Sequence, residues 1–248
     1  MANALISPQA LITKFQQALN DSFGYIYGEV HKMWTTADQK SLKAKYEKDP
    51  AKNSKYKLSA EYGGQWVGHW VTDCSGLFTW AFKELGGYMY HGSNTMYRDY
   101  CTAKGELHNG LRSDGQELKP GTAVFTGTES DHGHVGLYIG GGIVIEAQGA
   151  KAGVITSKVT IVKWTFWGEL KGVDYQGGED VPDVKPETGT AIVNDKKVAL
   201  REGPSTNCKV LARANKGDKV KLTNLPADWE YVTYNGKSGF MMKKFLDE

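Results

Sequence analysis

The stretch Val71-Thr72-Asp73-Cys74-Ser75-Gly76-Leu77-Phe78 decides the fold, because polar sequence gives way there to an apolar run. Apolar side chains then recur at positions 77, 78, 80, 81, 82 and 85, the spacing of a buried helical face. Asp73 is a favoured helix N-cap residue, and Gly86-Gly87 is a plausible stop. The sequence therefore predicts a helix with Cys74 in its first turn.

A thiol at that position is exposed to the positive end of the helix dipole and to free amide N–H groups, which favour the thiolate. The thiolate is the nucleophilic form of cysteine. A buried structural cysteine fits the same helical position, so the helix alone does not distinguish the two roles of Cys74.

A nucleophilic cysteine needs a base, and His134 opens an alternating strand sixty residues downstream. Gly140-Gly141-Gly142 predicts a hairpin to a second strand that carries Glu146 and Gln148. Both lie at even offsets from His134, so parity does not choose which of them orients the imidazole. His132, just before the strand core, is the competing base. The order cysteine, histidine, polar residue fits a papain-like thiol acyl-transfer site.

Composition narrows the classes of function. The chain has 248 residues, 40% of them hydrophobic, with a net charge of +2, so no global basic field argues for nucleic acid. No apolar run approaches the length of a membrane span. No CxxC, HExxH or phosphate-loop motif occurs, so we expect no metal and no cofactor. The remaining histidines have no partners at metal-ligand spacing and are interpreted as structural or surface residues; they are His31, His69, His91 and His108.

Two domains are expected. Residues 176–187 are acidic and bear Gly and Pro, which is typical of a linker between a domain at 1–175 and a second domain at 188–248. Short strands separated by tight turns recur in the second domain, a pattern typical of a small β-barrel. In the first domain, a helix is expected to end near Asn20-Asp21, and residues 31–63 read as a lysine-rich surface excursion with helical propensity from Ala37 to Tyr46. No firm period is visible over 88–118.

Three segments together resemble the NlpC-type family of papain-like cysteine peptidases: Asp73-Cys74-Ser75-Gly76, the strand 134–140 and Tyr25-Ile26-Tyr27-Gly28. The resemblance, which spans roughly residues 10 to 175, implies an α+β fold in which a helix-borne cysteine packs on an antiparallel sheet. It implies that Cys74 is the nucleophile and His134 the base. The third polar position falls on Glu146, where Glu is less usual than His, Asn or Gln, so Gln148 stays open.

The same resemblance implies that Tyr25, Asp73 and Ser75 help to hold the free N-terminal amine and the γ-D-glutamyl segment of the substrate. Residues 188–248 resemble a bacterial SH3 domain through the segments 198–205, 216–220 and 229–240. Such modules usually bind cell wall or steer the catalytic domain. This segment has 11 Lys and Arg against 7 Asp and Glu, a surplus of four.

The expected function is hydrolysis of peptidoglycan stem peptides between γ-D-glutamate and a diamino acid. One alternative is an N-acetylmuramoyl-L-alanine amidase, and another is a wall-binding protein with an idle hydrolase fold. The expected place of action is the bacterial cell wall, in a secreted, surface-bound or phage-borne protein. Residues 1–6 lack the features of a secretory signal, so we expect no signal peptide in this chain.

Overall fold

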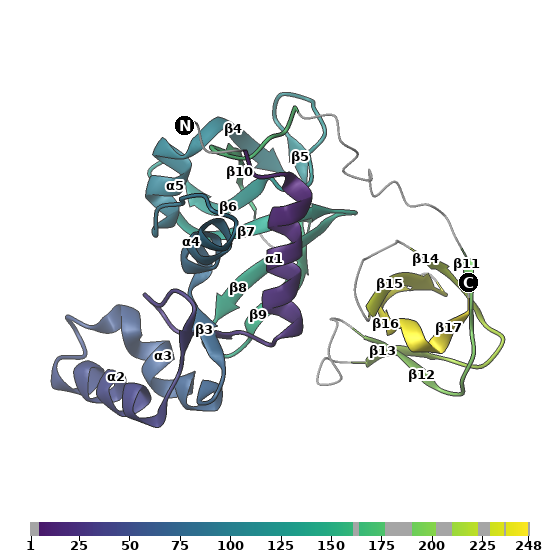
Figure 1. The fold of residues 1–248 in the computed structure, drawn as a ribbon, viewed down its shortest axis with the longest axis horizontal. Coiled ribbons are helices and arrows are strands. Elements are labelled where there is room, and N and C mark those ends of the chain that lie inside the picture. The colour runs from purple at the N-terminus through teal and green to yellow at the C-terminus, as the bar shows by residue number, and fades with distance from the viewer. Residues whose placement is uncertain are drawn as a thin grey trace. The chain divides into compact units, whose positions relative to one another are not determined.

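The computed structural model describes residues 5–160, 164–176, 190–201, 210–222, 229–235 and 237–247. The chain divides into two compact units, residues 1–179 and 180–248 (Figure 1). Almost all of the predicted linker lies outside the described residues, so the domain limits at 175 and 188 stay predictions. Among the described residues, no helix combines the length and apolar character needed to cross a membrane.

The first unit contains helices and two sheets. Its helical segments are α1 (Pro8–Asn20), α2 (Thr36–Lys48), η1 (Ser54–Tyr56), α3 (Lys57–Tyr62), η2 (Gly63–Trp66), α4 (Cys74–Glu84) and α5 (Ser93–Asp99). A small sheet has the order β1-β3-β2, with β1 (Gly24–Tyr25), β2 (Lys32–Met33) and β3 (Trp70–Thr72). The main sheet has the order β5-β4-β10-β6-β7-β8-β9. Its strands are β4 (Cys101–His108), β5 (Leu111–Arg112), β6 (Ala123–Thr128), β7 (Asp131–Gly140), β8 (Ile143–Gly149), β9 (Gly153–Lys158) and β10 (Phe166–Leu170).

The main sheet is antiparallel at each ladder between its strands, and α1 and α4 pack together on it at β7 and β8 (Figure 1). The rings of Phe15 in α1 and Phe78 in α4 meet edge to face at 4.7 Å, and both side chains are fully buried. Burial of one such ring contributes about 2–3 kcal/mol. The predicted α+β architecture, with a cysteine-bearing helix on an antiparallel sheet, is therefore confirmed.

The first helix forms where its capping residues predict it. Ser7 accepts a hydrogen bond from the Ala10 amide, and Pro8 occupies the first helical position, where its missing N–H has no partner to lose. The helix ends at Asn20, as expected. Its apolar stripe, which includes Leu11 and Phe15, faces α4 and the sheet.

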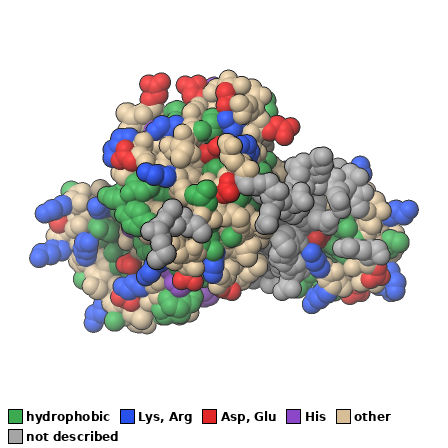
Figure 2. Space-filling view, turned by 45° about the horizontal axis from the view of Figure 1, so that its top comes forward, with side chains coloured by type: hydrophobic (Ala, Val, Ile, Leu, Met, Phe, Trp, Pro, Cys, Tyr) green, Lys and Arg blue, Asp and Glu red, His purple; other side chains and the backbone are tan. Residues whose placement is uncertain are grey.

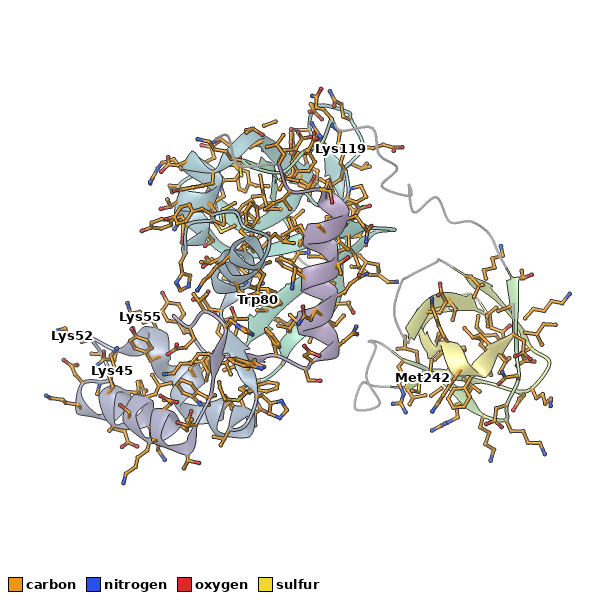
Figure 3. The ribbon with its side chains drawn as sticks, viewed as in Figure 1. Lys45, Lys52, Lys55, Trp80, Lys119 and Met242 are labelled. Carbon is orange, nitrogen blue, oxygen red and sulfur yellow. The ribbon has the colours of Figure 1, made fainter. Side chains whose placement is uncertain are left out.

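The predicted excursion at 31–63 contains α2, η1 and α3, and the expected helix is confirmed. None of the residues of α2 is buried. The helix is held at its start by a capping box between Thr35 and Asp38, and by Gln39, which accepts from the Trp34 indole and donates to Ala60 O. Lys45 lies 4.0 Å from the ring centre of Tyr56 (Figure 3). Figure 2 shows Lys and Arg side chains gathered at the end of the molecule where α2 lies.

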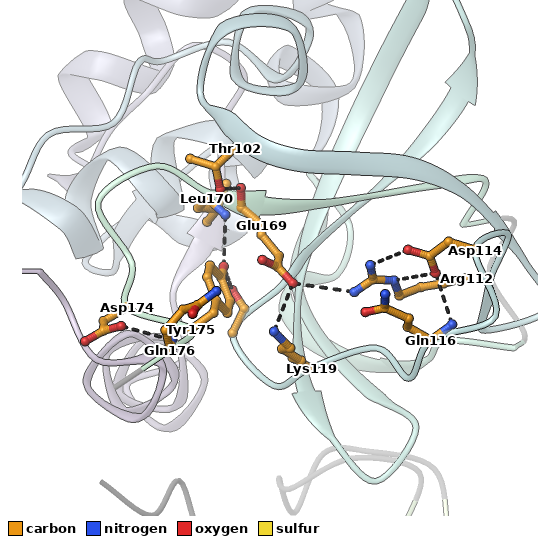
Figure 4. Close-up of polar contacts among 11 residues, drawn as sticks. Thr102, Arg112, Asp114, Gln116, Lys119, Glu169, Leu170, Asp174, Tyr175 and Gln176 are labelled. Atoms are coloured by element: carbon orange, nitrogen blue, oxygen red, sulfur yellow. Dashed lines mark hydrogen bonds and ion pairs between the residues drawn. The ribbon is translucent and has the colours of Figure 1, made fainter. Parts of the chain in front are cut away.

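The segment 88–118, which showed no firm period, folds into α5, β4 and β5. The buried Arg112 guanidinium fixes this region: it pairs with Asp114 and with Glu169 on β10, and it lies 3.5 Å from the ring centre of Trp167 (Figure 4). Lys119 also pairs with Glu169, at 3.5 Å. This polar cluster attaches the β5 segment to the edge of the main sheet.

The described residues of the second unit form strands and one short 3-10 turn. Its elements are β11 (Thr190–Val193), β12 (Val198–Arg201), β13 (Val210–Ala214), β14 (Lys219–Leu222), β15 (Trp229–Tyr234), β16 (Lys237–Met242), η3 (Lys243–Phe245) and β17 (Leu246–Asp247). The sheet order is β13-β12-β16-β15-β14-β11-β17. Burial alternates along β12, where Val198 and Leu200 enter the core while Ala199 and Arg201 face outward. The recurrence of short strands predicted for this domain is confirmed.

Candidate functional site

Asp73 caps α4, as its residue type predicts. Its extended backbone precedes the helix, and its Oδ1 accepts from the Gly76 amide at 2.7 Å. Cys74 is the first helical residue and its thiol is free, with 8% of the residue exposed. The cysteine therefore lies at the amino end of the helix, where the dipole and the free N–H groups stabilise a thiolate.

Gly76 allows this helix end to approach the rest of the domain. A Cβ atom at residue 76 would lie 2.3 Å from the Glu29 carbonyl oxygen and 2.8 Å from the Thr72 hydroxyl. The Asp73 amide also donates to the Glu29 carbonyl, at 2.9 Å. Glycine is thus required because the first turn of α4 packs directly on backbone that follows β1.

His134 on β7 contacts both the cysteine and an acid. Its imidazole lies close enough to the Cys74 side chain for that group to raise the pKa of the ring, and its Nε2 lies 2.6 Å from Oε2 of Glu146. Trp164 stacks on the imidazole, with ring centres 5.6 Å apart and planes 20° apart. Burial lowers the pKa of His134, but the hydrogen bonds and negative charges of Cys74 and Glu146 outweigh it and raise the pKa to about 9. The site thus favours the protonated form of the His134 imidazole.

The structure distinguishes the two acceptors that parity left open. Glu146 is 1% exposed and bonds to His134, whereas Gln148 is exposed. Leu137 pairs with Ile145 across the hairpin, so the same register sets Gly136 opposite Glu146. A Cβ at residue 136 would lie 3.3 Å from the Cβ of Glu146 and closer still to Val144 and Trp164. The glycine therefore leaves the space in which Glu146 reaches His134.

The competing histidine belongs to the core. His132 is 4% exposed and stacks on Tyr97, with ring centres 3.8 Å apart. The ring also packs edge to face against Phe166. Burial lowers the pKa of His132, which keeps its imidazole neutral at physiological pH. Its aromatic surroundings are those of a structural residue.

The three predicted substrate-binding residues lie next to the cysteine. Tyr25 on β1 pairs with Thr72 on β3, and burial, followed by the negative charges of Cys74 and Asp73, raises the pKa of its hydroxyl. Ser75 is 4% exposed and donates to Oδ1 of Asp73 at 3.1 Å. The structure thus brings Tyr25, Asp73 and Ser75 together with Cys74.

His91 was missed by the sequence analysis, which interpreted it as a structural or surface residue. Its Nε2 lies 2.9 Å from both carboxylate oxygens of Asp73. It follows α4 in a loop rich in Gly and Tyr, 18 residues after its partner. No local motif marks such a pair, because only the turn between α4 and α5 brings the two residues together.

Comparisons with known proteins match both units. Residues 58–168 match the model of the NlpC/P60 family, and residues 196–247 match that of the bacterial SH3 domain. Over 76 residues, 31% of this chain, the sequence is 34% identical to a probable endopeptidase p60 of Listeria grayi. The matched segment covers 13% of that curated relative, so the chain spans a small part of its length.

Several solved structures are similar. The NlpC/p60 domain of the peptidoglycan hydrolase SagA is 16% identical, with a TM-score of 0.43 over 66% of this chain and all of that one. The P60 domain of the M. avium subspecies paratuberculosis antigen MAP1204 is 16% identical, with a TM-score of 0.41 over 68% and 96%. RipD of Mycobacterium tuberculosis, described as a non-catalytic NlpC/p60 domain protein adapted to peptidoglycan binding, is 17% identical, with a TM-score of 0.38 over 65% and 95%.

Proposed function

Because residues 58–168 are an NlpC/P60 domain and residues 196–247 a bacterial SH3 domain, we propose that the chain is a cysteine endopeptidase of the bacterial cell wall. Its substrate is the peptidoglycan stem peptide, cut between γ-D-glutamate and a diamino acid. The observation that carries the proposal is the contact of the Cys74 thiol at a helix amino end with His134, which in turn bonds to buried Glu146.

In the proposed reaction, the Cys74 thiolate attacks the amide carbonyl carbon and forms a tetrahedral intermediate. The backbone N–H of Cys74 and a neighbouring donor stabilise its oxyanion. Protonated His134 then gives its proton to the departing amine, and the carbon–nitrogen bond breaks to leave a thioester. His134 next takes a proton from water, which attacks the thioester and releases the acid and the Cys74 thiolate.

Glu146 is assigned the orienting role. Its carboxylate accepts from Nε2 of His134, which leaves Nδ1 as the ring nitrogen directed at Cys74. Tyr25, Asp73 and Ser75 are assigned to substrate binding beside Cys74. The carboxylate of Asp73 already has partners at both oxygens, and the Ser75 hydroxyl is one of them, so the Tyr25 hydroxyl is the more available group for a substrate.

The second unit is assigned to wall binding. A hollow of about 290 Å³ on its surface is lined by Val198, Ala199, Met242 and Phe245 and by the cations Lys196, Lys197, Arg201 and Arg213. Asp195 is the one acid among these described lining residues. Guanidinium and ammonium groups over an apolar floor suit a carboxylate-bearing peptide.

Digestion of defined muropeptides, followed by mass analysis, tests the proposal. New amino groups on the diamino acid identify an endopeptidase, whereas free lactyl ends identify the amidase alternative. Cys74→Ala is expected to abolish cleavage, and Cys101→Ala serves as the matched control. Intact muropeptides together with tight sedimentation on purified wall would instead support an idle, wall-binding domain.

A further inference from the structure

The carboxylate of Asp73 is unusually crowded for a group beside a candidate nucleophile. It is 6% exposed, and Oδ1 accepts from Gly76 N and Ser75 Oγ while Oδ2 accepts from Gly28 N at 2.9 Å. His91 approaches both oxygens at 2.9 Å. Three segments distant in sequence, those of Gly28, Asp73 and His91, therefore meet at the amino end of α4.

The negative charge of Asp73 lies next to Cys74, and His91 offsets it. A buried carboxylate directly before Cys74 opposes the thiolate, since like charges at short range disfavour ionisation. Among the described residues, His91 forms the ion pair with Asp73, and its own side chain is 32% exposed against 8% for the acid. A protonated His91 neutralises the carboxylate while leaving its hydrogen bonds to the helix intact.

We infer that His91 is a positioning residue of the site: in its protonated form it holds Asp73 as a charge-compensated cap of α4 and so preserves the Cys74 thiolate. The consequence for hydrolysis rests on the proposed function, whereas the effect on the thiol does not. Because His91, unlike Arg or Lys, can lose its charge near neutral pH, the ionisation of the Cys74 thiol depends on the protonation of His91 as well as on that of His134.

The direction of that dependence follows from the groups that face His91. The hydrogen bond and charge of Asp73, reinforced by the charge of Glu29, raise the pKa of His91 above its ordinary value against the opposing effect of burial. The protonated form therefore persists above pH 6.5 and is lost as the pH rises through the raised value. Over acid and neutral pH the protonated His91 thus compensates Asp73, and loss of the His91 side chain should lower the reactivity of Cys74 in that range.

The test measures Cys74 itself. The rate of alkylation by iodoacetamide, followed at the Cys74 peptide by mass spectrometry, gives the thiol pKa in the full chain without any substrate. In His91→Gln we expect that pKa to rise by about one unit, with alkylation at pH values below the thiol pKa slowed roughly three- to tenfold. His91→Arg, which keeps the charge, should retain the wild-type value. His108→Gln is the matched control, because His108 is an exposed histidine that pairs with Glu106 on β4.

A hydrolysis assay separates this inference from the proposed function. In His91→Gln the acid limb of kcat/KM should move to higher pH than in the wild type, because the Cys74 thiol then ionises less readily, whereas His91→Arg should keep the wild-type limb. An unchanged thiol pKa or an unmoved acid limb in a folded His91→Gln variant would overturn the role of His91. If the wild type cuts no muropeptide, the proposed function fails, while the alkylation series still decides the inference.

Discussion

Nε2 of His134 lies 2.6 Å from Oε2 of Glu146, and the acid is buried while its neighbour on the same strand face, Gln148, is exposed. A buried carboxylate at this distance fixes both the orientation and the charge of the imidazole. The hairpin therefore contributes a complete acid–base unit to the amino end of α4.

Replacement of Glu146 tests this pairing. In Glu146→Gln an acceptor oxygen remains but the negative charge is lost, so the pKa of His134 falls from about 9 and less of the thiolate–imidazolium pair forms. We expect kcat/KM on a defined muropeptide to fall about tenfold or more. Gln148→Ala is the matched control and should change kcat/KM by less than about twofold. Equal losses in the two variants would contradict the assignment.

Stability should also depend on the protonation of His134. The pKa of His134 in the folded chain, about 9, exceeds its ordinary value of 6.5. The stabilisation is therefore complete below pH 6.5 and is lost as the pH rises through 9. We expect the free energy of unfolding in urea to fall over this window, by on the order of 1–3 kcal/mol. The decline should be shallower in Glu146→Gln, and parallel curves for the two proteins would argue against the pair.

Gly136 offers a steric test of the same hairpin. An alanine there would bring its Cβ to 2.5 Å from Val144 Cγ1 and 2.9 Å from the Trp164 ring, so the strands or Glu146 must shift. We expect Gly136→Ala to destabilise the domain by about 1–3 kcal/mol and to lower kcat/KM. Gly133→Ala on the same strand meets its nearest side-chain atom only at 4.0 Å and should unfold like the wild type. Calorimetric melting of both variants provides the comparison.

A substitution at Arg112 should lower the stability of the domain without changing the reactivity of Cys74. Arg112→Met leaves the half-buried Glu169 with Lys119 as its remaining ion-pair partner among the described residues. We expect a loss of about 3 kcal/mol in unfolding free energy. Alkylation of Cys74 at temperatures below the melting transition should be unchanged, because the cluster lies on the β4–β10 side of the sheet (Figure 4). Asp114→Asn, at the exposed end of the cluster, should have a smaller effect on stability.

Much of the site could be predicted from the sequence because it depends on residues that are close together in the chain. Asp73 caps the helix that follows it, and the alternation after His134 defines a strand, so both placements needed only neighbouring residues. Parity did not separate Glu146 from Gln148: Glu146 is buried and bonds to His134, whereas Gln148 is exposed at the register shift between Ala147 and Gly149. Parity carries no information on that shift.

Contacts between distant segments were not predictable in the same way. His91 meets Asp73 through a turn without a repeating pattern, and Trp164 reaches His134 from the segment that precedes β10. The region 88–118 lacked periodicity because its burial alternates irregularly along β4, with Leu107 as the fully buried residue near its end. Tertiary packing, rather than local propensity, determines these positions.

The exposed helix α2 has a consequence for how this domain can diversify. It buries no residue; it is attached at its start by Thr35, Asp38 and Gln39, and one turn further Leu42 packs against the buried cluster of Ile26, Trp34 and Val71. Substitutions on its remaining surface thus leave the hydrophobic interior untouched. The exposed residues of α2 can therefore be substituted, in evolution or by design, to bind a different surface while the residues around Cys74 keep their arrangement.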